Sequence, residues 1–143
     1  MPEGPVREIG DATVGALMSK PVRTVTPATT IDELTELMTV YDYNGFPVVD
    51  VDGILQGLVT RTDLFKLYLE PYRRPGPTGV PATVGQIMSR RVIVLRPEER
   101  VFTAIALMVE HRVITIPVVT PTPRGPQVVG VITRRDAAGA LKP

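Results

Sequence analysis

Two copies of one short motif carry the residue types best suited to chemistry: "GLVTRTD" at 57–63 and "GVITRRD" at 130–136. Both end in threonine, two variable residues and an aspartate, Asp63 or Asp136. A carboxylate one turn into a helix is suited to accept hydrogen bonds from ribose hydroxyls, and the N–H groups at a helix start attract phosphate. The same spacing also forms a capping box, which needs no ligand. The motif alone leaves both interpretations open.

Composition argues against most catalytic sites. The chain of 143 residues has no cysteine and a single histidine, His111, which excludes a thiolate nucleophile and a cysteine-based or multi-histidine zinc site within one chain. Neither a glycine-rich phosphate loop of the P-loop type nor a serine–histidine nucleophile pattern is present. We therefore predict no enzymatic activity, no catalytic residue, no metal site and no required cofactor.

Charge and hydropathy bear on partners and location. The 16 Lys and Arg residues nearly balance the 15 Asp and Glu residues, and the basic residues are not interleaved with aromatic ones, so we do not expect nucleic-acid binding. No apolar run approaches the roughly 18 to 20 residues of a membrane span, and residues 1–12 lack the apolar core of a signal peptide. We expect a cytoplasmic protein that does not associate with membranes.

The chain is an internal duplication. With a shift of 70 residues, "TVGALMS" (13–19) aligns with "TVGQIMS" (83–89), and Pro47 aligns with Pro117. Three extra residues enter within "TPTPRGPQ", which predicts a surface turn there, and the closing motifs align with a shift of 73. The domain organisation follows from these alignments: an N-terminal extension (1–12), a first repeat (13–69), a linker rich in proline and glycine (70–82) and a second repeat (83–141).

Each repeat predicts the same elements. A short helix begins after Thr13 or Thr83, and a strand, "VRTVT" or "VIVL", follows and is ended by proline. Helical spacing then predicts amphipathic helices from about 31 and 101, followed by a hairpin and a last helix after the motif threonine. We predict a mixed α+β fold of two βαββα repeats.

The chain resembles a tandem pair of cystathionine beta-synthase (CBS) domains, through "TVGxxMS", the "PVV" strand and the closing "GxxTxxD" in both copies. The resemblance implies a Bateman-type module with a pseudo-twofold axis and two clefts between the repeats. The ligands it implies are AMP, ADP, ATP, S-adenosylmethionine or sometimes a dinucleotide. Whether Mg²⁺ accompanies such a ligand stays open.

The resemblance also implies which residues line each cleft. The stretch "YNGFPVV" is similar to CBS pairs of chloride transport proteins, in which a tyrosine stacks on adenine, although Tyr43 also suits an ordinary core position. Arg134 and Arg135 would favour phosphate, unless they only form a solvated helix face. The first cleft would comprise Val22, Arg23, Thr24, Tyr43, Asn44, Phe46, Pro47, Thr133, Arg135 and Asp136.

The second cleft lacks an aromatic residue where the first has Tyr43, because Val113 stands at that position. We therefore expect two unequal sites. The second cleft would comprise Thr60, Thr62, Asp63, Val92, Ile93, Val94, Ile114, Thr115 and Pro117.

A second apolar stripe on the helix of the second repeat predicts a homodimer. The stripe consists of Phe102, Ile105, Ala106 and Val109. The first repeat has Asp32, Thr35, Glu36 and Thr39 at these positions. A helix that is apolar on two sides must be buried on both, and in a small chain the second side most simply meets another subunit.

These patterns favour a non-enzymatic, energy-sensing regulatory protein. A nucleotide in the clefts would shift the relative angle of the repeats and so signal to a protein target that the sequence does not identify. The alternatives are an interaction or scaffold module with vestigial clefts, and, with less support, a nucleic-acid-binding member of the family.

Overall fold

The chain forms two compact units whose bounds differ from those of the sequence repeats. The computed structural model describes residues 11–20, 22–73 and 83–141, with side chains omitted for 70–73. Residues 1–22 and 93–143 form one unit, here called the terminal unit, and residues 23–92 form the central unit. The leading segment of each repeat therefore belongs to the unit that contains the hairpin of the other repeat.

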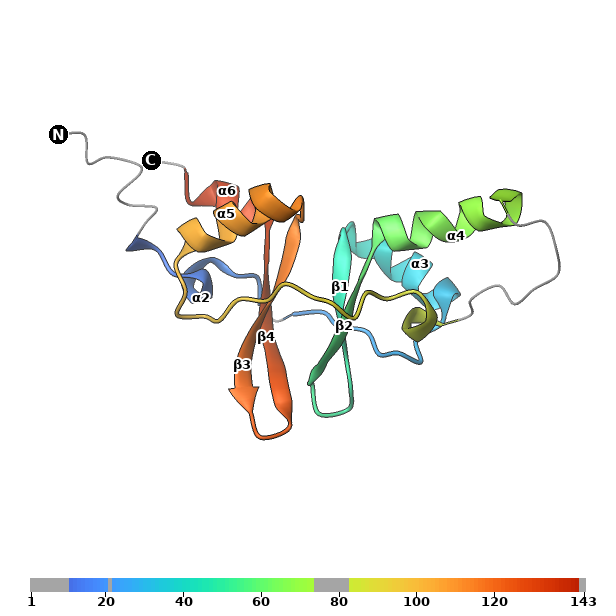
Figure 1. The fold of residues 1–143 in the computed structure, drawn as a ribbon, viewed down its shortest axis with the longest axis horizontal. Coiled ribbons are helices and arrows are strands. Elements are labelled where there is room, and N and C mark those ends of the chain that lie inside the picture. The colour runs from blue at the N-terminus through green and yellow to red at the C-terminus, as the bar shows by residue number, and fades with distance from the viewer. Residues whose placement is uncertain (1–10, 21, 74–82, 142–143) are drawn as a thin grey trace. The chain divides into compact units, whose positions relative to one another are not determined.

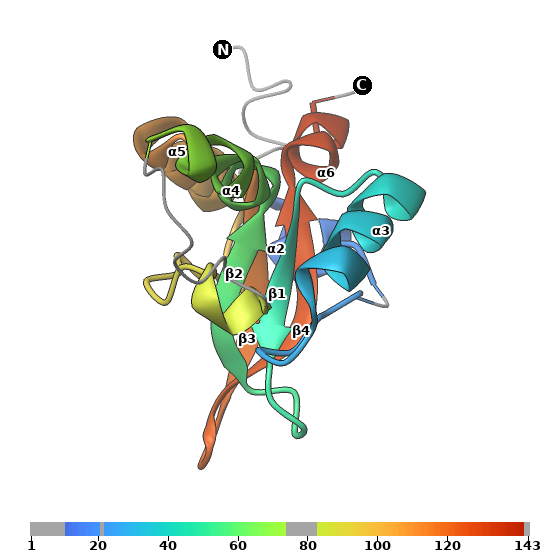
Figure 2. The same ribbon diagram turned by 90° about the vertical axis from the view of Figure 1, so that its right-hand side faces the viewer.

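The central unit is a β-hairpin with two helices. Strands β1 (Gly45–Val49) and β2 (Leu55–Thr60) pair antiparallel, and helices α3 (Ile31–Tyr41) and α4 (Arg61–Arg73) lie on either side of the hairpin in Figure 2. Helix α3 begins with a capping box between Thr30 and Glu33, as its sequence favours. Its apolar spacing buries Leu34 and Met38, which confirms the predicted amphipathic helix.

The terminal unit repeats this arrangement. It contains α2 (Val14–Leu17), α5 (Val101–His111), β3 (Thr115–Thr122), β4 (Gly125–Thr133) and α6 (Arg134–Gly139). Figure 1 shows α5 and α6 at the open end of the β3–β4 hairpin, opposite its turn. The three extra residues lengthen this hairpin, since the ladder continues to the pair of Thr122 and Gly125. The surface turn predicted there is confirmed, but most of "TPTPRGPQ" is strand.

The hydrophobic cores show the exchange of the leading segments. Val14 of the first repeat is fully buried in the core of the terminal unit, and Val84 of the second repeat is fully buried in that of the central unit. Matching backbone hydrogen bonds hold both: the Gly15 N–H donates to the Pro97 carbonyl at 2.8 Å, and the Gly85 N–H donates to the Pro27 carbonyl at 2.9 Å. Each unit therefore contains the leading segment of the repeat whose hairpin lies in the other unit.

The strands predicted for "VRTVT" and "VIVL" are each reduced to one bridging residue. Val25 donates to the Pro47 carbonyl and accepts from the Val49 N–H, which forms a single parallel bridge to β1. The next donors along this ladder would be the N–H groups of positions 47 and 27, and both are prolines. Leu95 forms the matching bridge to Val118, with prolines at the equivalent positions.

The remaining elements lie near the predicted linker. The predicted helix after Thr83 is a single 3₁₀ turn, Val84–Gln86, whereas α2 begins after Thr13 as expected. Helix α4 continues to Arg73, so the first residues of the predicted linker are helical; residues 74–82 and the extension 1–10 lie outside the described residues. In the described part of the chain, every helix is too short or too polar to cross a membrane.

Candidate functional site

The motif at 130–136 forms a capping box at the start of α6. The Thr133 N–H and Oγ1 both donate to Asp136 Oδ2, each over 2.9 Å, and the Asp136 N–H donates back to Thr133 Oγ1 over 3.2 Å. Both residues therefore satisfy donors that the first turn of a helix would otherwise leave unpaired. The structural interpretation of threonine-x-x-aspartate is correct for this copy.

The first copy of the motif has the same geometry at the start of α4. The Thr60 N–H and Oγ1 donate to Asp63 Oδ2 over 2.8 and 3.0 Å, and the Asp63 N–H returns a bond to Thr60 Oγ1 over 3.3 Å. Thr62 lies between them and is exposed. Because a capping box uses one carboxylate oxygen here, it leaves the other oxygen available for a further contact.

The glycine of each motif allows a segment of the other repeat to cross the hairpin. A Cβ on Gly57 would lie 2.6 Å from the Ser89 carbonyl oxygen, and one on Gly130 would lie 2.6 Å from Met18 Sδ. Backbone hydrogen bonds join Ser89 to Leu58 and join Ser19 to Val131 at these crossings. The "MS" that ends each leading segment is therefore packed against the glycine of the other repeat's motif.

The two motif aspartates differ in their second partner. Ser19 Oγ lies 3.0 Å from both carboxylate oxygens of Asp136 and donates to them. In the central unit, the matching Ser89 Oγ instead donates to the Arg91 carbonyl over 3.2 Å. Both oxygens of Asp136 thus have protein partners, whereas for Asp63, among the described residues, only Oδ2 is bonded.

A row of aromatic side chains lies beside the start of β1 in the central unit. The rings of Tyr41 and Tyr43 stack with centroids 5.8 Å apart, and Tyr43 contacts Phe46 at 5.4 Å in a tilted arrangement. The Arg23 guanidinium carbon lies 3.8 Å from the centre of the Tyr41 ring, a cation–π distance. The Val25 bridge to β1 brings Arg23 and Thr24 alongside this row.

Tyr43, whose ring is expected from the family resemblance to stack on adenine, lies on the surface. Tyr43 is 41% exposed, and Asn44 next to it is exposed, so the alternative of an ordinary core aromatic is wrong for this residue. Phe46 is only 1% exposed and belongs to the core of the central unit, and Pro47 is buried beside it. Phe46 therefore contacts the Tyr43 ring from within the core, and its own ring is not exposed.

The matching region of the terminal unit is aliphatic. Leu95 bridges to β3, which places Ile93 and Val94 alongside Thr115 and Pro117. Val94 is 38% exposed, whereas Thr115 is 6% exposed and Pro117 is buried. The second predicted site therefore lacks an exposed ring at this place, consistent with two unequal sites.

Each predicted cleft takes residues from both units. The terminal unit holds Val22, Thr133, Arg135 and Asp136 of the first cleft, and the central unit holds Arg23, Thr24 and the 43–47 stretch. For the second cleft, Thr60, Thr62, Asp63 and Val92 belong to the central unit and the others to the terminal unit. Within the halves, hydrogen bonds join Thr133 to Asp136 and Thr60 to Asp63, and Tyr43 contacts Phe46. The joining of the halves stays a prediction.

Sequence reasoning missed two contributors. The sequence marks Ser19 only as the last residue of the repeated "TVGALMS" and places Tyr41 only within the amphipathic helix expected from about 31. The repetition of "MS" before each predicted strand was the one signal for Ser19. Tyr41 lies two residues before Tyr43 and had no signal, because its contact to Arg23 depends on the course of the segment after residue 22.

The predicted dimer stripe lies on the surface of α5. Phe102 is 56% exposed and Val109 is 74% exposed, while Ile105 and Ala106 are half-buried. Ile105 and Val109 also line a groove of about 430 Å³ between α5 and α6. Over the residues described here, no cluster of three or more His, Cys, Asp or Glu side chains is suited to hold a metal ion.

Comparisons with known proteins agree with the duplication. The CBS domain family matches residues 14–70 and 84–143. A crystal structure of CBSX2 in complex with AMP is similar, with a TM-score of 0.78 and 27% identity, covering 90% of this chain and 95% of that chain. The CBS domain pair of protein MJ0100, in complex with 5-methylthioadenosine and S-adenosylmethionine, has a TM-score of 0.76 and 26% identity, covering 90% and 94%.

Curated relatives include both short and long proteins. The CBS domain-containing protein YhcV of Bacillus subtilis is 30% identical over 121 residues, which covers 85% of this chain and 79% of YhcV. The chain spans only about a fifth of longer relatives with enzyme names, for example 23% of an inosine-5'-monophosphate dehydrogenase from Halobacterium salinarum. CBS domain pairs are generally regulatory modules. This chain belongs to the CBS domain family and consists of a tandem pair of CBS domains.

Proposed function

We propose that the chain is a non-enzymatic regulatory module that binds an adenosine nucleotide or S-adenosylmethionine in the clefts between its two CBS repeats and signals by a change of conformation. The observation that carries the proposal is the exposed ring of Tyr43 beside Asn44, stacked on a second tyrosine. A flat surface ring next to an amide is suited to adenine, which needs stacking together with a donor and an acceptor. The adenosine ligands of two structural relatives support the same chemistry.

The ribose and phosphate contacts are proposed for the helix starts. Asp136 and Asp63 would accept bonds from ribose hydroxyls, and Arg135 would contact phosphate. At the start of α6, the Arg134 N–H already donates to the Ile114 carbonyl over 2.9 Å, and the Asp136 N–H is used by the capping box. Of these first three N–H groups, that of Arg135 has no bond to the described residues, so its side chain and amide together would supply the phosphate contact.

The two sites would differ in how readily a ribose hydroxyl could bond to the aspartate. At Asp136, a hydroxyl would have to share or replace the Ser19 bond, whereas Asp63 offers one carboxylate oxygen without competition from the described residues. The first site has the exposed ring and the second has the more accessible carboxylate. Unequal affinities for the same nucleotide follow from this division.

A titration of the purified chain with AMP, ADP, ATP, S-adenosylmethionine and NAD tests the proposal. At about 100 times the dissociation constant, a ligand should stabilise the protein by roughly 2.7 kcal/mol and raise the melting temperature by about 5 to 10 °C. Tyr43→Val, which copies Val113 of the other repeat, should remove most of this rise. The control is Val51→Ala, at a side chain that is 96% exposed in the first hairpin turn.

Aspartate variants separate ligand contact from capping. Because Asp63 and Asp136 both cap helices, any substitution lowers the melting temperature of the free protein by itself. Asp136→Asn and Asp63→Asn keep a side-chain oxygen for the threonine, so the informative quantity is the ligand-induced rise within each variant. A rise that is unchanged in both variants and in Tyr43→Val would contradict the proposed contacts.

A scaffold with vestigial clefts is the second candidate, and one observation favours it. Both motif aspartates close a capping box with the threonine of their motif, so the repeated "GxxTxxD" needs no ligand to explain it. This alternative predicts no thermal shift with any of the nucleotides and variants that melt earlier with or without them. Its function would then be to present surfaces to a protein target.

We also propose a homodimer that uses the α5 stripe of Phe102, Ile105, Ala106 and Val109, and a cytoplasmic location. Two large side chains of the stripe, Phe102 and Val109, are more than half exposed, which leaves apolar surface to cover. A nucleotide that favours one arrangement of the repeats would change the surface that a dimer presents to its target.

A further inference from the structure

A serine hydroxyl already bonds to the carboxylate that we propose binds ribose at the first site. Ser19 Oγ lies 3.0 Å from each carboxylate oxygen of Asp136 and donates to them. The O–H of serine and the O–H of a ribose are both alcohol donors, so they suit the same acceptor. Asp136 therefore has an alcohol partner from its own chain before any nucleotide binds.

The capping box leaves only part of the Asp136 carboxylate open to such a donor. A carboxylate has about four acceptor positions, two on each oxygen. The N–H and Oγ1 of Thr133 both donate to Oδ2. Because the single hydroxyl proton of Ser19 serves both oxygens, a ribose hydroxyl that bonds to either oxygen weakens or replaces its bond. Ribose and Ser19 would therefore compete for Asp136.

The backbone at Ser19 is held independently of this bond. The Ser19 N–H donates to the Val131 carbonyl over 2.8 Å, and the Val131 N–H donates back to the Ser19 carbonyl over 3.3 Å. Ser19 itself is exposed. Rotation about its Cα–Cβ bond can therefore take the hydroxyl from Asp136 into solvent without moving the backbone.

The central unit shows the equivalent serine with its hydroxyl bonded elsewhere. Ser89 forms the matching backbone pair with Leu58, in which both hydrogen bonds are 2.9 Å long. Its Oγ donates to the Arg91 carbonyl over 3.2 Å, and Asp63 Oδ1 has no bond to the described residues. The same backbone arrangement thus accommodates two positions of the serine side chain, one on the carboxylate and one off it.

We propose that Ser19 sets the affinity of the first site, because its hydroxyl competes with ribose for Asp136. When a ribose hydroxyl bonds to Asp136, the Ser19 hydroxyl leaves the carboxylate. The inference rests on the proposed nucleotide site and adds a residue that raises the nucleotide concentration needed to fill it. At the second site, Asp63 has no such competitor among the described residues.

Competition and a purely structural role predict opposite effects of Ser19→Ala on binding. A bond that only shaped the site would weaken binding when it is removed. Loss of a competitor should instead tighten the binding of ATP and AMP at the first site about fivefold, because ribose no longer has to replace the Ser19 bond. Tighter binding by a chain that is less stable without nucleotide is the result expected of competition.

Isothermal titration calorimetry with ATP and AMP measures the change in two backgrounds. Asp63→Asn keeps the Asp136 carboxylate, and Ser19→Ala should tighten binding in that chain. Asp136→Asn removes the carboxylate for which Ser19 competes, so Ser19→Ala should then have no effect. Ser89→Ala in the Asp136→Asn chain is the matched control, and it should leave binding at the second site unchanged because Ser89 donates to a backbone carbonyl.

Dideoxy forms of the same nucleotides separate competition from a change in the shape of the site. Dideoxy-ATP and dideoxy-AMP lack both ribose hydroxyls, so they leave the Ser19–Asp136 bond in place, and Ser19→Ala should not change their affinity. Ser19→Thr keeps the hydroxyl and should bind ATP as the parent chain does. Threonine suits the extended bridge of Ser19 to Val131. Equal gains for the ribose and dideoxy forms would overturn the competition.

The remaining outcomes separate this inference from the proposed function. If ATP or AMP binds the Asp63→Asn chain but Ser19→Ala does not tighten it, the inference is wrong and the proposed nucleotide site stands. If binding to the parent chain disappears in Asp63→Asn, the inference is wrong and the proposed function holds at the second site alone. If the parent chain binds none of these nucleotides, the proposed function and this inference both fail.

Discussion

Ser19 and Asp136 are 117 positions apart in the chain, and the serine hydroxyl lies 3.0 Å from both carboxylate oxygens. The bond joins the end of the first repeat's leading segment to the capping residue of the second repeat's last helix. The bond therefore joins the exchanged leading segment of the first repeat to the motif that we propose binds ribose. Its counterpart in the central unit is absent, since Ser89 Oγ donates to the Arg91 carbonyl instead.

Ser19→Ala should lower the free energy of unfolding by about 1 kcal/mol, because a hydrogen bond to a charged group is lost at a partly exposed site. Ser89→Ala should cost less, since its bond is to a neutral carbonyl two residues away. Urea denaturation of both variants measures the difference. Equal losses would show that the Ser19–Asp136 bond adds nothing to stability.

Gly57→Ala should destabilise more than Gly130→Ala. The new Cβ would meet the Ser89 backbone oxygen at 2.6 Å in the first case, whereas in the second the nearest atom is the movable Met18 sulfur. We expect a loss of about 1 to 3 kcal/mol for Gly57→Ala. Gly139→Ala is the control, because a Cβ there meets nothing within 4 Å and alanine favours a helix by about 0.5 to 1 kcal/mol. A neutral Gly57→Ala would contradict the close crossing.

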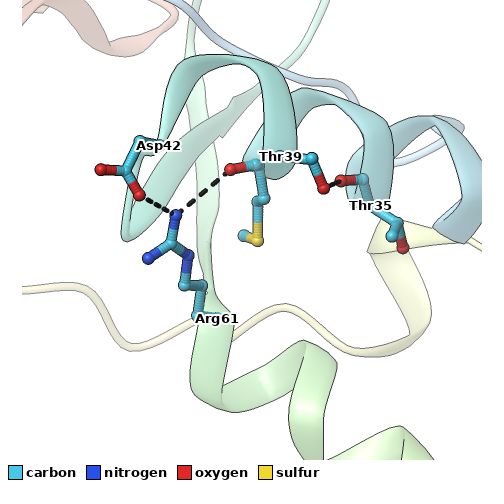
Figure 3. Close-up of polar contacts among 5 residues, drawn as sticks. Thr35, Thr39, Asp42 and Arg61 are labelled. Atoms are coloured by element: carbon cyan, nitrogen blue, oxygen red, sulfur yellow. Dashed lines mark hydrogen bonds and ion pairs between the residues drawn. The ribbon is translucent and has the colours of Figure 1, made fainter.

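The ion pair of Arg61 and Asp42 should contribute little by itself. The Asp42 side chain is 89% exposed, so Asp42→Asn should change stability by less than about 1 kcal/mol, and added salt should shrink the difference. Arg61→Ala should cost more, because Arg61 also donates to the Met38 carbonyl near the end of α3 (Figure 3). Thermal melts at low and high salt compare the two, and a larger loss for Asp42→Asn would reverse this assignment.

Phe102→Glu combined with Ile105→Glu should convert the proposed dimer into monomers, because two charges would be buried in an apolar contact. Light scattering over a concentration series measures the change. Val51→Glu, at a position that is 96% exposed in a hairpin turn, provides the control for an added charge. A dimer that survives the double substitution would place the contact elsewhere on the chain.

The sequence by itself determined the local elements. Thr13, Thr30 and Thr133 cap their helices because the hydroxyl and the donor it accepts from lie within three residues of each other. Helical spacing likewise identified the buried residues Leu34 and Met38 of α3 and Val101 and Ala104 of α5. The extra residues located a surface turn, although most of that segment extends the strands. These features depend on contacts between residues that are close in sequence, and the same patterns occur in both repeats.

The tertiary structure decided which copy of each segment packs where. Both repeats carry nearly the same "TVGxxMS", so packing within a repeat and packing across repeats satisfy the same pattern, and the sequence does not choose between them. Packing across repeats places Val14 and Val84 in the exchanged cores and Ser19 on Asp136. The ring of Tyr43 is exposed for the same reason: its surroundings are set by segments distant in sequence, where burial and hydrogen bonding across the fold outweigh any local preference.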